Sequence, residues 1–171
     1  MTGKGSLNHN SRKFHAKNTD PNRTHWNVEY CNEDIKDVYH ELFDDALKRY
    51  NDKQTRKDRK IDDYYEKIRS GKQEKLFHEV ILQIGDKDNM GSETMEGQLA
   101  AKILDEYMKG FQERNPALRV FAAHLHMDET TPYLHVDFVP YTTGSKRGLD
   151  TRVSLKQALS ALGFKGGTRI E

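Results

Sequence analysis

The stretch "HLHMDETTPYLH" (residues 124–135) concentrates side chains that can bind a metal ion or move a proton. It holds three histidines, two acids and a tyrosine within an otherwise ordinary polar sequence. Imidazole nitrogens and carboxylate oxygens are common ligands of divalent cations. The same residue types are also familiar as hydrogen-bonded groups beside a surface turn, so the expected placement of the side chains has to separate the two interpretations.

Residues 118–126 and 133–141 are predicted to be the two strands of a hairpin. Because side chains alternate across a strand, one face receives only apolar residues, namely Phe121, Ala123, Leu125, Leu134, Val136 and Phe138. The opposite face receives His124, His126, Tyr133, His135 and Asp137. Opposed Cβ atoms on neighbouring strands are roughly 5 Å apart, so His126 is expected close to Tyr133 or His135. This segregation favours a metal site, with Asp128 and Glu129 at its rim.

A period of 3.6 residues predicts helices before the hairpin. Between residues 34 and 50 the apolar positions are Ile35, Val38, Tyr39, Leu42, Phe43, Ala46, Leu47 and Tyr50. The pattern stops over residues 51–60 and then resumes at Ile61, Tyr64, Tyr65 and Ile68. Either one long helix with a solvated middle or two helices would fit. The two tyrosines are interpreted as core residues rather than nucleophiles, because their spacing matches that of the isoleucines.

Three further elements complete the predicted domain. Residues 75–85 suggest a strand, and Ser92 is expected to cap a helix that ends before Pro116. The buried stripe of that helix is predicted to be Met95, Leu99, Ile103, Met108 and Phe111. A last helix starts at Ser154, which forms a capping box with Gln157, and ends at Gly163. The order of helix, strand, helix, hairpin and helix predicts an α+β fold with an antiparallel β-sheet flanked by helices.

The composition fits one domain of 171 residues that acts in the cytoplasm. No apolar run is long enough to span a bilayer, and the N-terminus has no apolar signal region. Cys31 is the only cysteine, which excludes an internal disulfide and fits a reducing compartment. The net charge is only +1, but basic residues gather in blocks, including the loop with Lys146 and Arg147. Such blocks can follow a phosphate backbone, although a basic face is more often simply solvated.

Three short motifs occur along the chain: "HNSR" (9–12), "HWNVEY" (25–30) and "HMDETTPYLH" (126–135). In the same order, they resemble the H-N-x-R, N-x-E and H-x-D-E-x-T-P-H-x-H motifs of the Mob/Pre plasmid relaxases (the MobV family, or plasmid recombination enzymes). The matched region extends over most of the chain. Three spaced motifs are far more specific than the histidines alone.

The resemblance implies an HUH-type relaxase domain over residues 1–171, in which paired histidines on central strands bind a divalent metal. Such enzymes nick one strand of plasmid DNA at the origin of transfer, stay attached to the 5′ phosphate, and start mobilisation. The implied roles are attack by His9, metal binding by His126 and His135, an acid at Glu129, and DNA binding or ordering of the nucleophile by Asn10, Arg12 and Asn27. Imidazole ligands suit Mn²⁺, Co²⁺ or Zn²⁺ better than Mg²⁺, and we expect Mn²⁺.

Two departures from the family pattern leave alternatives open. Tyr133 stands where the signature has its second histidine, so either His124 supplies the third nitrogen, or water or the tyrosine oxygen completes the shell. The eight residues before His9 are too few for a full leading strand and loop, which indicates a family variant or an incomplete N-terminus. At the other end, "GGTRIE" brings no closing element, and the domain would then be the N-terminal part of a longer protein.

Two other functions remain as alternatives at this point. A DNA-binding module with the relaxase fold but weakened or lost cleavage is consistent with Tyr133. A metal-dependent phosphodiesterase unconnected to plasmid transfer would need the same metal site. Nicking of supercoiled plasmid in Mn²⁺, with protein left on the 5′ end, separates all three.

Overall fold

The computed structural model describes residues 2–3, 6–14 and 16–164. These residues form two compact units. The first contains the described parts of 1–32, 78–114 and 120–138, and the second contains those of 33–77, 115–119 and 139–171. The residues 118–119 and 139–142 at the ends of the two long central strands belong to the second unit, and all the residues of the three motifs lie in the first.

The first unit is organised by an antiparallel sheet with the strand order β1-β3-β5-β4-β2. Its strands are β1 (Thr2–Gly3), β2 (Val28–Asn32), β3 (His78–Gln83), β4 (Leu118–His126) and β5 (Tyr133–Thr142). The predicted hairpin is therefore confirmed as β4 and β5, at the centre of the sheet. Strand β3 pairs with β5, with Val80 opposite Val136 and Leu82 opposite Leu134. In these apolar pairs the β5 residues are fully buried and the β3 residues are half-buried.

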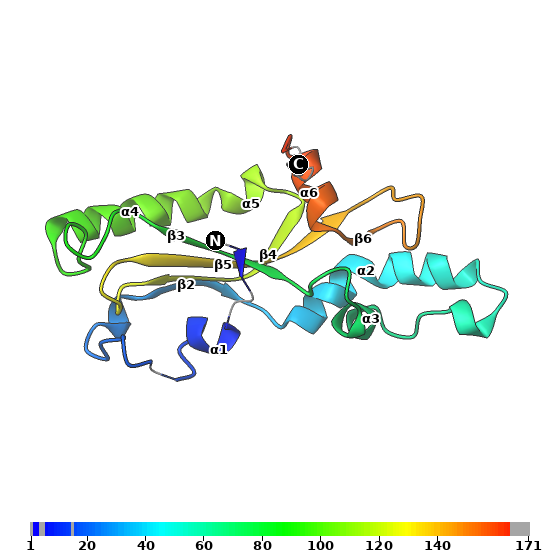
Figure 1. The fold of residues 1–171 in the computed structure, drawn as a ribbon, viewed down its shortest axis with the longest axis horizontal. Coiled ribbons are helices and arrows are strands. Elements are labelled where there is room, and N and C mark those ends of the chain that lie inside the picture. Colours follow the sequence, from blue (N-terminus) through cyan, green and yellow to red (C-terminus); the bar gives the residue numbers. More distant parts are fainter. Residues whose placement is uncertain (1, 4–5, 15, 165–171) are drawn as a thin grey trace, which may run out of the picture. The chain divides into compact units, whose positions relative to one another are not determined.

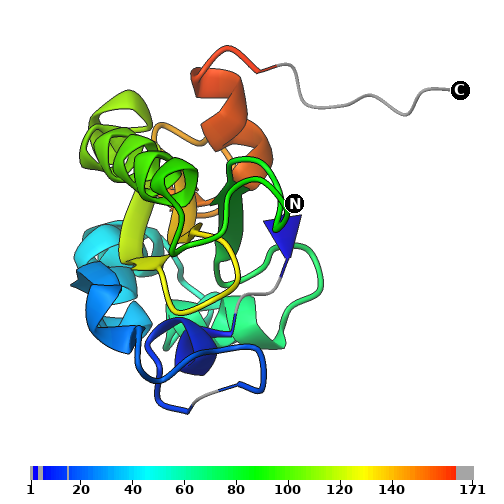
Figure 2. The same cartoon turned by 90° about the vertical axis from the view of Figure 1, so that its left-hand side faces the viewer.

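Helices cover both faces of this sheet. Helix α4 (Met95–Lys109) lies along one face, and the short helix α1 (Leu7–Asn10) lies on the other. The same arrangement is visible end-on in Figure 2, after Figure 1 has been turned by 90°. The apolar face of the hairpin includes Phe121, Ala123, Leu134 and Val136, each 0% exposed. The apolar face of the hairpin thus packs into the core, as its alternation predicts.

The buried stripe predicted for α4 is wrong at three of its five positions. Met95, Leu99 and Ile103 are 86%, 59% and 49% exposed, whereas the core side carries Gly97, Ala100, Ala101, Leu104 and Met108. A Cβ on Gly97 would lie 1.9 Å from the carbonyl oxygen of Gly91, so the first turn of α4 sits directly on backbone. Close approach of this kind selects small side chains, and the larger apolar residues face outward.

The cap of α4 also differs from the prediction. Thr94 is the N-cap, and its hydroxyl accepts a hydrogen bond from the Gly97 amide. Ser92, the predicted cap, is buried and donates its hydroxyl proton to the carbonyl oxygen of Glu129 at 2.9 Å. The serine therefore fixes the β4–β5 loop.

The second unit contains two helices where the sequence allowed one or two. Helix α2 (Ile35–Asp52) and helix α3 (Tyr64–Ser70) are separated by the short 3-10 helix η2 (Lys57–Arg59). Asn51 joins them, because its side chain exchanges two hydrogen bonds with the backbone of Ile61, at 2.8 and 2.9 Å. Tyr64 is buried and its ring lies 4.9 Å from that of Phe43, which confirms its interpretation as a core residue.

The last elements are strand β6 (Arg152–Val153), paired with β5, and helix α6 (Leu155–Ala161). The Ser154 hydroxyl accepts from the Gln157 amide, so the predicted capping position is confirmed. Gly163 follows the helix with a φ of 87°, as expected for a residue after a C-terminus.

Four elements of the first unit are absent from the sequence-based prediction: β1, α1, the 3-10 helix η1 (Thr24–Trp26), and β2. They are short or lie at a sheet edge, where hydrophobic alternation is weak. Within the part of the chain that the structure describes, none of the helices is both long and apolar enough to cross a membrane.

Candidate active site

The candidate site lies where α1 covers the polar face of the hairpin. Ser6 caps the helix through its side chain, which accepts from the amide of His9. One turn then projects His9 and Asn10 toward β4 and β5, and Asn10 is only 1% exposed. The first motif is thereby brought onto the third, although 116 residues separate Asn10 from His126.

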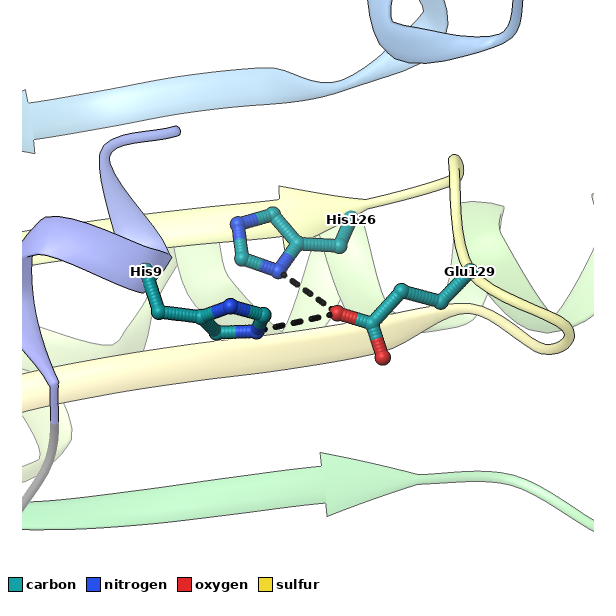
Figure 3. A group of neighbouring side chains, drawn as sticks. All are labelled: His9, His126 and Glu129. Carbon is teal, nitrogen blue, oxygen red and sulfur yellow. Dashed lines mark ion pairs between the residues drawn. The ribbon is translucent and has the colours of Figure 1, made fainter. Parts of the chain in front are cut away.

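Three side chains converge at this point. Nε2 of His9 lies 3.3 Å from Oε1 of Glu129, and Nδ1 of His126 lies 3.5 Å from the same oxygen. One ligand atom from each of the three residues falls within 4.8 Å of the other two. Figure 3 shows His9 from α1, His126 from β4 and Glu129 from the loop, all pointing to one spot.

Hydrogen bonding defines which nitrogen of His126 faces the cluster. Nε2 lies 2.8 Å from the carbonyl oxygen of Asn10, which can only accept, so Nε2 carries the proton. In the neutral ring the lone pair is then on Nδ1, which is buried without a hydrogen-bond donor. That lone pair faces a carboxylate oxygen, which also only accepts. Two buried acceptors in contact need a cation or a proton between them.

Arg12 connects α1 to the loop between the strands. Its guanidinium donates from Nε to Oδ2 of Asp128 at 2.9 Å and from Nη2 to both Asp128 and Glu129. Its Nη1 lies 3.2 Å from Nε2 of His9. Arg12 also has a φ of 50°, a conformation that costs energy for a residue with a side chain. All three guanidinium nitrogens are engaged with the protein, which leaves Arg12 to order the nucleophile and the acids, the second of its two expected roles.

Asn27, from the second motif, holds the other side of the same loop. Its Oδ1 accepts hydrogen bonds from the amides of Met127 and Asp128, at 2.7 and 3.1 Å. Arg23 adds bonds from Nη1 to the carbonyl oxygens of Met127 and Glu129. The loop that carries the two acids is therefore fixed from several elements.

His135 lies beside the cluster and has a carboxylate of its own. Its ring centroid is 4.7 Å from that of His126 and 6.2 Å from that of His9. Nδ1 lies 2.8 Å from Oε1 of Glu79 on β3, so this nitrogen carries the proton and the lone pair is on Nε2. A carboxylate behind a histidine is a common support for a metal ligand.

A second carboxyl group lies next to Glu79. Asn10 donates from Nδ2 to Glu79 and to Asp137, at 2.8 and 3.0 Å. Asn10 was expected to contact DNA or to order the nucleophile, and its buried amide is occupied by these two acids. The amide therefore holds α1 against β3 and β5.

His124 and Tyr133 lie further out on the same face. Nε2 of His124 contacts Glu29 of β2 at 3.1 Å, and its ring centroid is 6.0 Å from that of His126. The ring of Tyr133 is 6.4 Å from that of His135. The three-residue cluster contains neither of them.

The electrostatics of the site lower the pKa values of two imidazoles and two acids. Burial, together with the positive charge of Arg12, lowers the pKa of His9, and burial lowers the pKa of His124. Burial alone would raise the pKa of Glu129 and of Asp128. A hydrogen bond from His126, when its Nδ1 carries a proton, and the guanidinium of Arg12 outweigh burial at Glu129. Arg12 with Asn27 outweighs it at Asp128, and both pKa values fall to about 2.

Asp137 behaves in the opposite way. Its side chain is fully buried, and this desolvation, with the neighbouring negative charge of Glu79, raises its pKa to about 7. Glu79 would also rise through burial, but hydrogen bonds from His135 and Asn10 hold its pKa below the usual value. Glu79 is thus ionised near neutral pH, whereas Asp137 holds its proton up to about pH 7.

The residues present fit a divalent cation. Nδ1 of His126, which has no hydrogen-bond partner, and Oε1 of Glu129 face each other at 3.5 Å, and the neighbouring ring of His135 has its lone pair on Nε2. Nitrogen and oxygen donors of this kind suit Mn²⁺ and Zn²⁺. With an ion bound there, His9 would lie beside it as a neutral imidazole, which is the form that a nucleophile needs.

Sequence reasoning missed Glu79, which supports His135, and gave no role to Glu29, although that residue lies within the second motif. Glu79 and Glu29 lie on β3 and β2, and Glu79 is the only acid in the strand sequence "HEVILQ". A buried acid in an otherwise apolar strand was a usable signal. Lys146 and Arg147, which were expected to bind DNA, are exposed residues of the second unit.

Comparison with known proteins gives one family and one fold. The sequence profile of the plasmid recombination enzymes (Mob_Pre) matches residues 4–163. A Mn-bound MobM relaxase domain in complex with 22 nucleotides of plasmid pMV158 oriT DNA superimposes with a TM-score of 0.52 and 27% identity, covering 88% of this chain and 67% of that one. The complex of the same domain with 23 nucleotides gives a TM-score of 0.48 and 26% identity, covering 90% of this chain and 66% of that one.

The curated protein sequences contain no match. The profile nevertheless extends over almost all of the described residues. The chain belongs to the Mob_Pre family of plasmid recombination enzymes, and it has the fold of the MobM relaxase domain.

Proposed function

We propose that this chain is a relaxase that nicks one strand of plasmid DNA at an origin of transfer and stays attached to the 5′ phosphate. The observation that carries the proposal is the convergence of His9, His126 and Glu129 on one point, in a member of this family. The MobM relaxase domain was crystallised with Mn and with oriT DNA. The same ligand and substrate are proposed here, in the cytoplasm, where plasmid DNA is found.

His9 is the proposed nucleophile. Nε2 attacks the scissile phosphorus in line, a nitrogen–phosphorus bond forms, and the bond from phosphorus to the 3′ oxygen breaks. The 3′ oxygen leaves and takes up a proton, and the 5′ phosphate remains on the histidine as a phosphoramidate. The lowered pKa of His9 supports this role, because only the neutral ring has a free electron pair.

The proposed metal ligands are His126, Glu129 and His135. Nδ1 of His126 and Oε1 of Glu129 already face each other, and the Nε2 lone pair of His135 is left free by its contact with Glu79. When bound, Mn²⁺ would polarise the scissile phosphate and stabilise its charge in the transition state. In this proposal Glu129 supplies the donor that the family signature has at position 133, and His124 is a more distant support.

Arg12, Asn10 and Asn27 are proposed as positioning residues. Their polar atoms are occupied by Asp128, Glu79, Asp137 and the loop amides, so they hold the nucleophile and the acids in register. Tyr133, Lys146 and Arg147 are the proposed contacts to DNA. The two basic residues are exposed, and Tyr133 is half-buried at the start of β5.

The decisive experiment is nicking of supercoiled DNA from the replicon that encodes the chain. We expect open circles in Mn²⁺, with protein on the 5′ end, and none in EDTA. Binding without nicking would instead identify a DNA-binding module that has lost cleavage, an alternative favoured by Tyr133. Cleavage without a covalent adduct would identify a hydrolytic phosphodiesterase.

A further inference from the structure

A cleft of about 640 Å³ lies within the second unit, between helix α3 and the segment 147–153. Its volume is within the ~300–1,000 Å³ range of small-molecule sites. Four cations stand around it: Lys67, Lys72, Arg147 and Arg152. We refer to this feature as the cationic cleft. Glu74 is the one carboxylate that lines it, so positive charge is in excess.

The cleft cations carry no acidic partner. Several arginines of the same unit, Arg49, Arg56, Arg69 and Arg119, each form an ion pair with a carboxylate. Among the described residues, no carboxylate forms an ion pair with any cation of the cleft. Lys67, Lys72 and Arg147 are exposed, whereas Arg152 is half-buried and donates to Ser145. The charges of the three exposed residues are therefore available to an anion.

The floor of the cleft is apolar. It is formed by Tyr64, Ile68, Leu149 and Val153, and three of these are buried, at 8%, 2% and 1% exposure for Tyr64, Leu149 and Val153. The Tyr64 hydroxyl is occupied, because it accepts from the amide of Val153 at 3.2 Å. A ligand that uses the whole cleft must combine negative charge with a flat or apolar part.

The wall that carries Arg147 is held in place by a set of polar contacts. Asp150 makes a two-pronged contact with Arg49 of α2, with both distances at 2.8 Å. The Ser145 amide donates to the carbonyl oxygen of Asp150, and Ser145 Oγ accepts from Nε of Arg152 at 3.0 Å. Gly148 turns the chain with a φ of 72°, which L side chains rarely adopt. The cleft is thus a built feature of the fold.

We infer that the cationic cleft binds a nucleotide of single-stranded DNA, with the phosphate between the cations at the rim and the base against the apolar floor. The inference rests on the proposed function only in taking DNA as the polymer. A free phosphate would contact the cations but leave the apolar floor unused. An acidic peptide would bring no flat group to place against that floor. Base stacking or packing on a floor of this kind is tolerant of sequence, so the cleft adds affinity for a strand without selecting its bases.

Binding of a labelled single-stranded oligonucleotide in EDTA tests the inference apart from metal and nicking. The variant is Lys72→Gln/Arg147→Gln. The control is Lys57→Gln/Lys102→Gln, which removes the same charge from exposed positions outside the cleft. Each phosphate contact contributes about −0.7 to the slope of log K against log salt for single strands. We expect the slope to flatten by roughly 1.4 in the variant and to stay unchanged in the control.

Methyl NMR spectra locate the base. We expect the signals of Ile68, Leu149 and Val153 to shift on addition of the oligonucleotide to the wild type, and not in the variant. An unchanged slope in the variant, or floor methyls that do not respond, would overturn the inference. So would equal shifts with inorganic phosphate or with poly-glutamate, which would make the cleft a general anion site. Nicking activity in wild type would stand in each of these cases.

Discussion

Nε2 of His126 donates a hydrogen bond to the carbonyl oxygen of Asn10 at 2.8 Å, and this contact joins the first motif to the third. It fixes the tautomer of His126 and turns its Nδ1 lone pair toward Glu129. Asn10 contributes a second link, because its amide binds both Glu79 and Asp137. The residue next to the proposed nucleophile thus organises the histidine and the acids behind it.

The first prediction concerns the metal. His126→Ala and His135→Ala should each abolish tight Mn²⁺ binding in calorimetry, because each removes a nitrogen of the proposed shell. His124→Ala should weaken binding only partly, since this ring contacts Glu29. The matched control is His40→Ala, an exposed histidine of α2, which should bind as the wild type does. Unaltered binding by the His135 variant would remove that residue from the shell.

The second prediction concerns the nucleophile. His9→Ala should eliminate covalent attachment to DNA while Mn²⁺ and DNA binding persist, and Tyr133→Phe should cost less. The adduct should be labile in acid and stable in alkali, as expected for a phosphoramidate. Because the pKa of His9 is lowered, attachment should be constant near neutral pH and fall only below about 6.5, the ordinary histidine value. An acid-stable adduct in the absence of His9 would show that a tyrosine attacks.

The third prediction concerns the ion pair of Arg12 with Asp128. The folded-state pKa of Asp128 is lowered to about 2, so its contribution to stability is complete above the unfolded value of 3.8 and is lost as pH falls toward 2. One unit of pKa corresponds to about 1.4 kcal/mol. Asp128→Asn should therefore lower the free energy of unfolding by about 2 kcal/mol at pH 7, and by progressively less in acid.

Urea unfolding at a series of pH values measures this effect. The control is Asp58→Asn, which removes an exposed acid paired with Arg56 and should change stability little. A penalty for Asp128→Asn that is the same at pH 7 and at pH 2 would contradict the linkage.

The fourth prediction concerns Asp137, whose linkage has the opposite sign. With a folded-state pKa raised to about 7, the carboxyl group is protonated in the fold while it ionises in the unfolded chain. The wild type therefore loses stability as pH rises from about 4 to about 7. Asp137→Asn keeps an oxygen that accepts from Asn10, but it cannot ionise, so its stability lacks this pH-dependent loss. In EDTA, the stability of the variant relative to wild type should be higher at pH 8 than at pH 5, and an equal difference at both values would refute the assignment.

The hairpin was predictable because alternation along a strand leaves little choice. Once residues 118–126 and 133–141 are strands, an apolar set on one face requires the histidines on the other, and the ring of His126 does lie 4.7 Å from that of His135. The family resemblance added His9, which no periodicity could bring to the hairpin. The tertiary contact with Glu129 depends on α1, a helix of four residues that carries no sequence signal of its own.

Other features were not predictable because packing decided them. In α4, size and hydrophobicity favoured Met95 and Leu99 as core residues, but contact of Gly97 with the Gly91 backbone turned that face outward. Arg12 looked like a phosphate ligand until Asp128 and Glu129 occupied it. Glu79 became important only through the register that places β3 beside β5. Each of these three features depends on which segments of the chain pack together. A single sequence does not contain that information directly.

The contacts of Asn10 have a consequence for how the protein is made. The partners of Asn10 are Glu79, His126 and Asp137, which follow it in the sequence by 69, 116 and 127 positions. A ribosome adds about 5–20 residues per second, so roughly 6–25 s separate the synthesis of α1 from that of its last partner. During this time His9 has neither its acid nor its neighbouring imidazoles. A nascent chain therefore lacks the complete cluster, which forms only when the hairpin has been translated and folded.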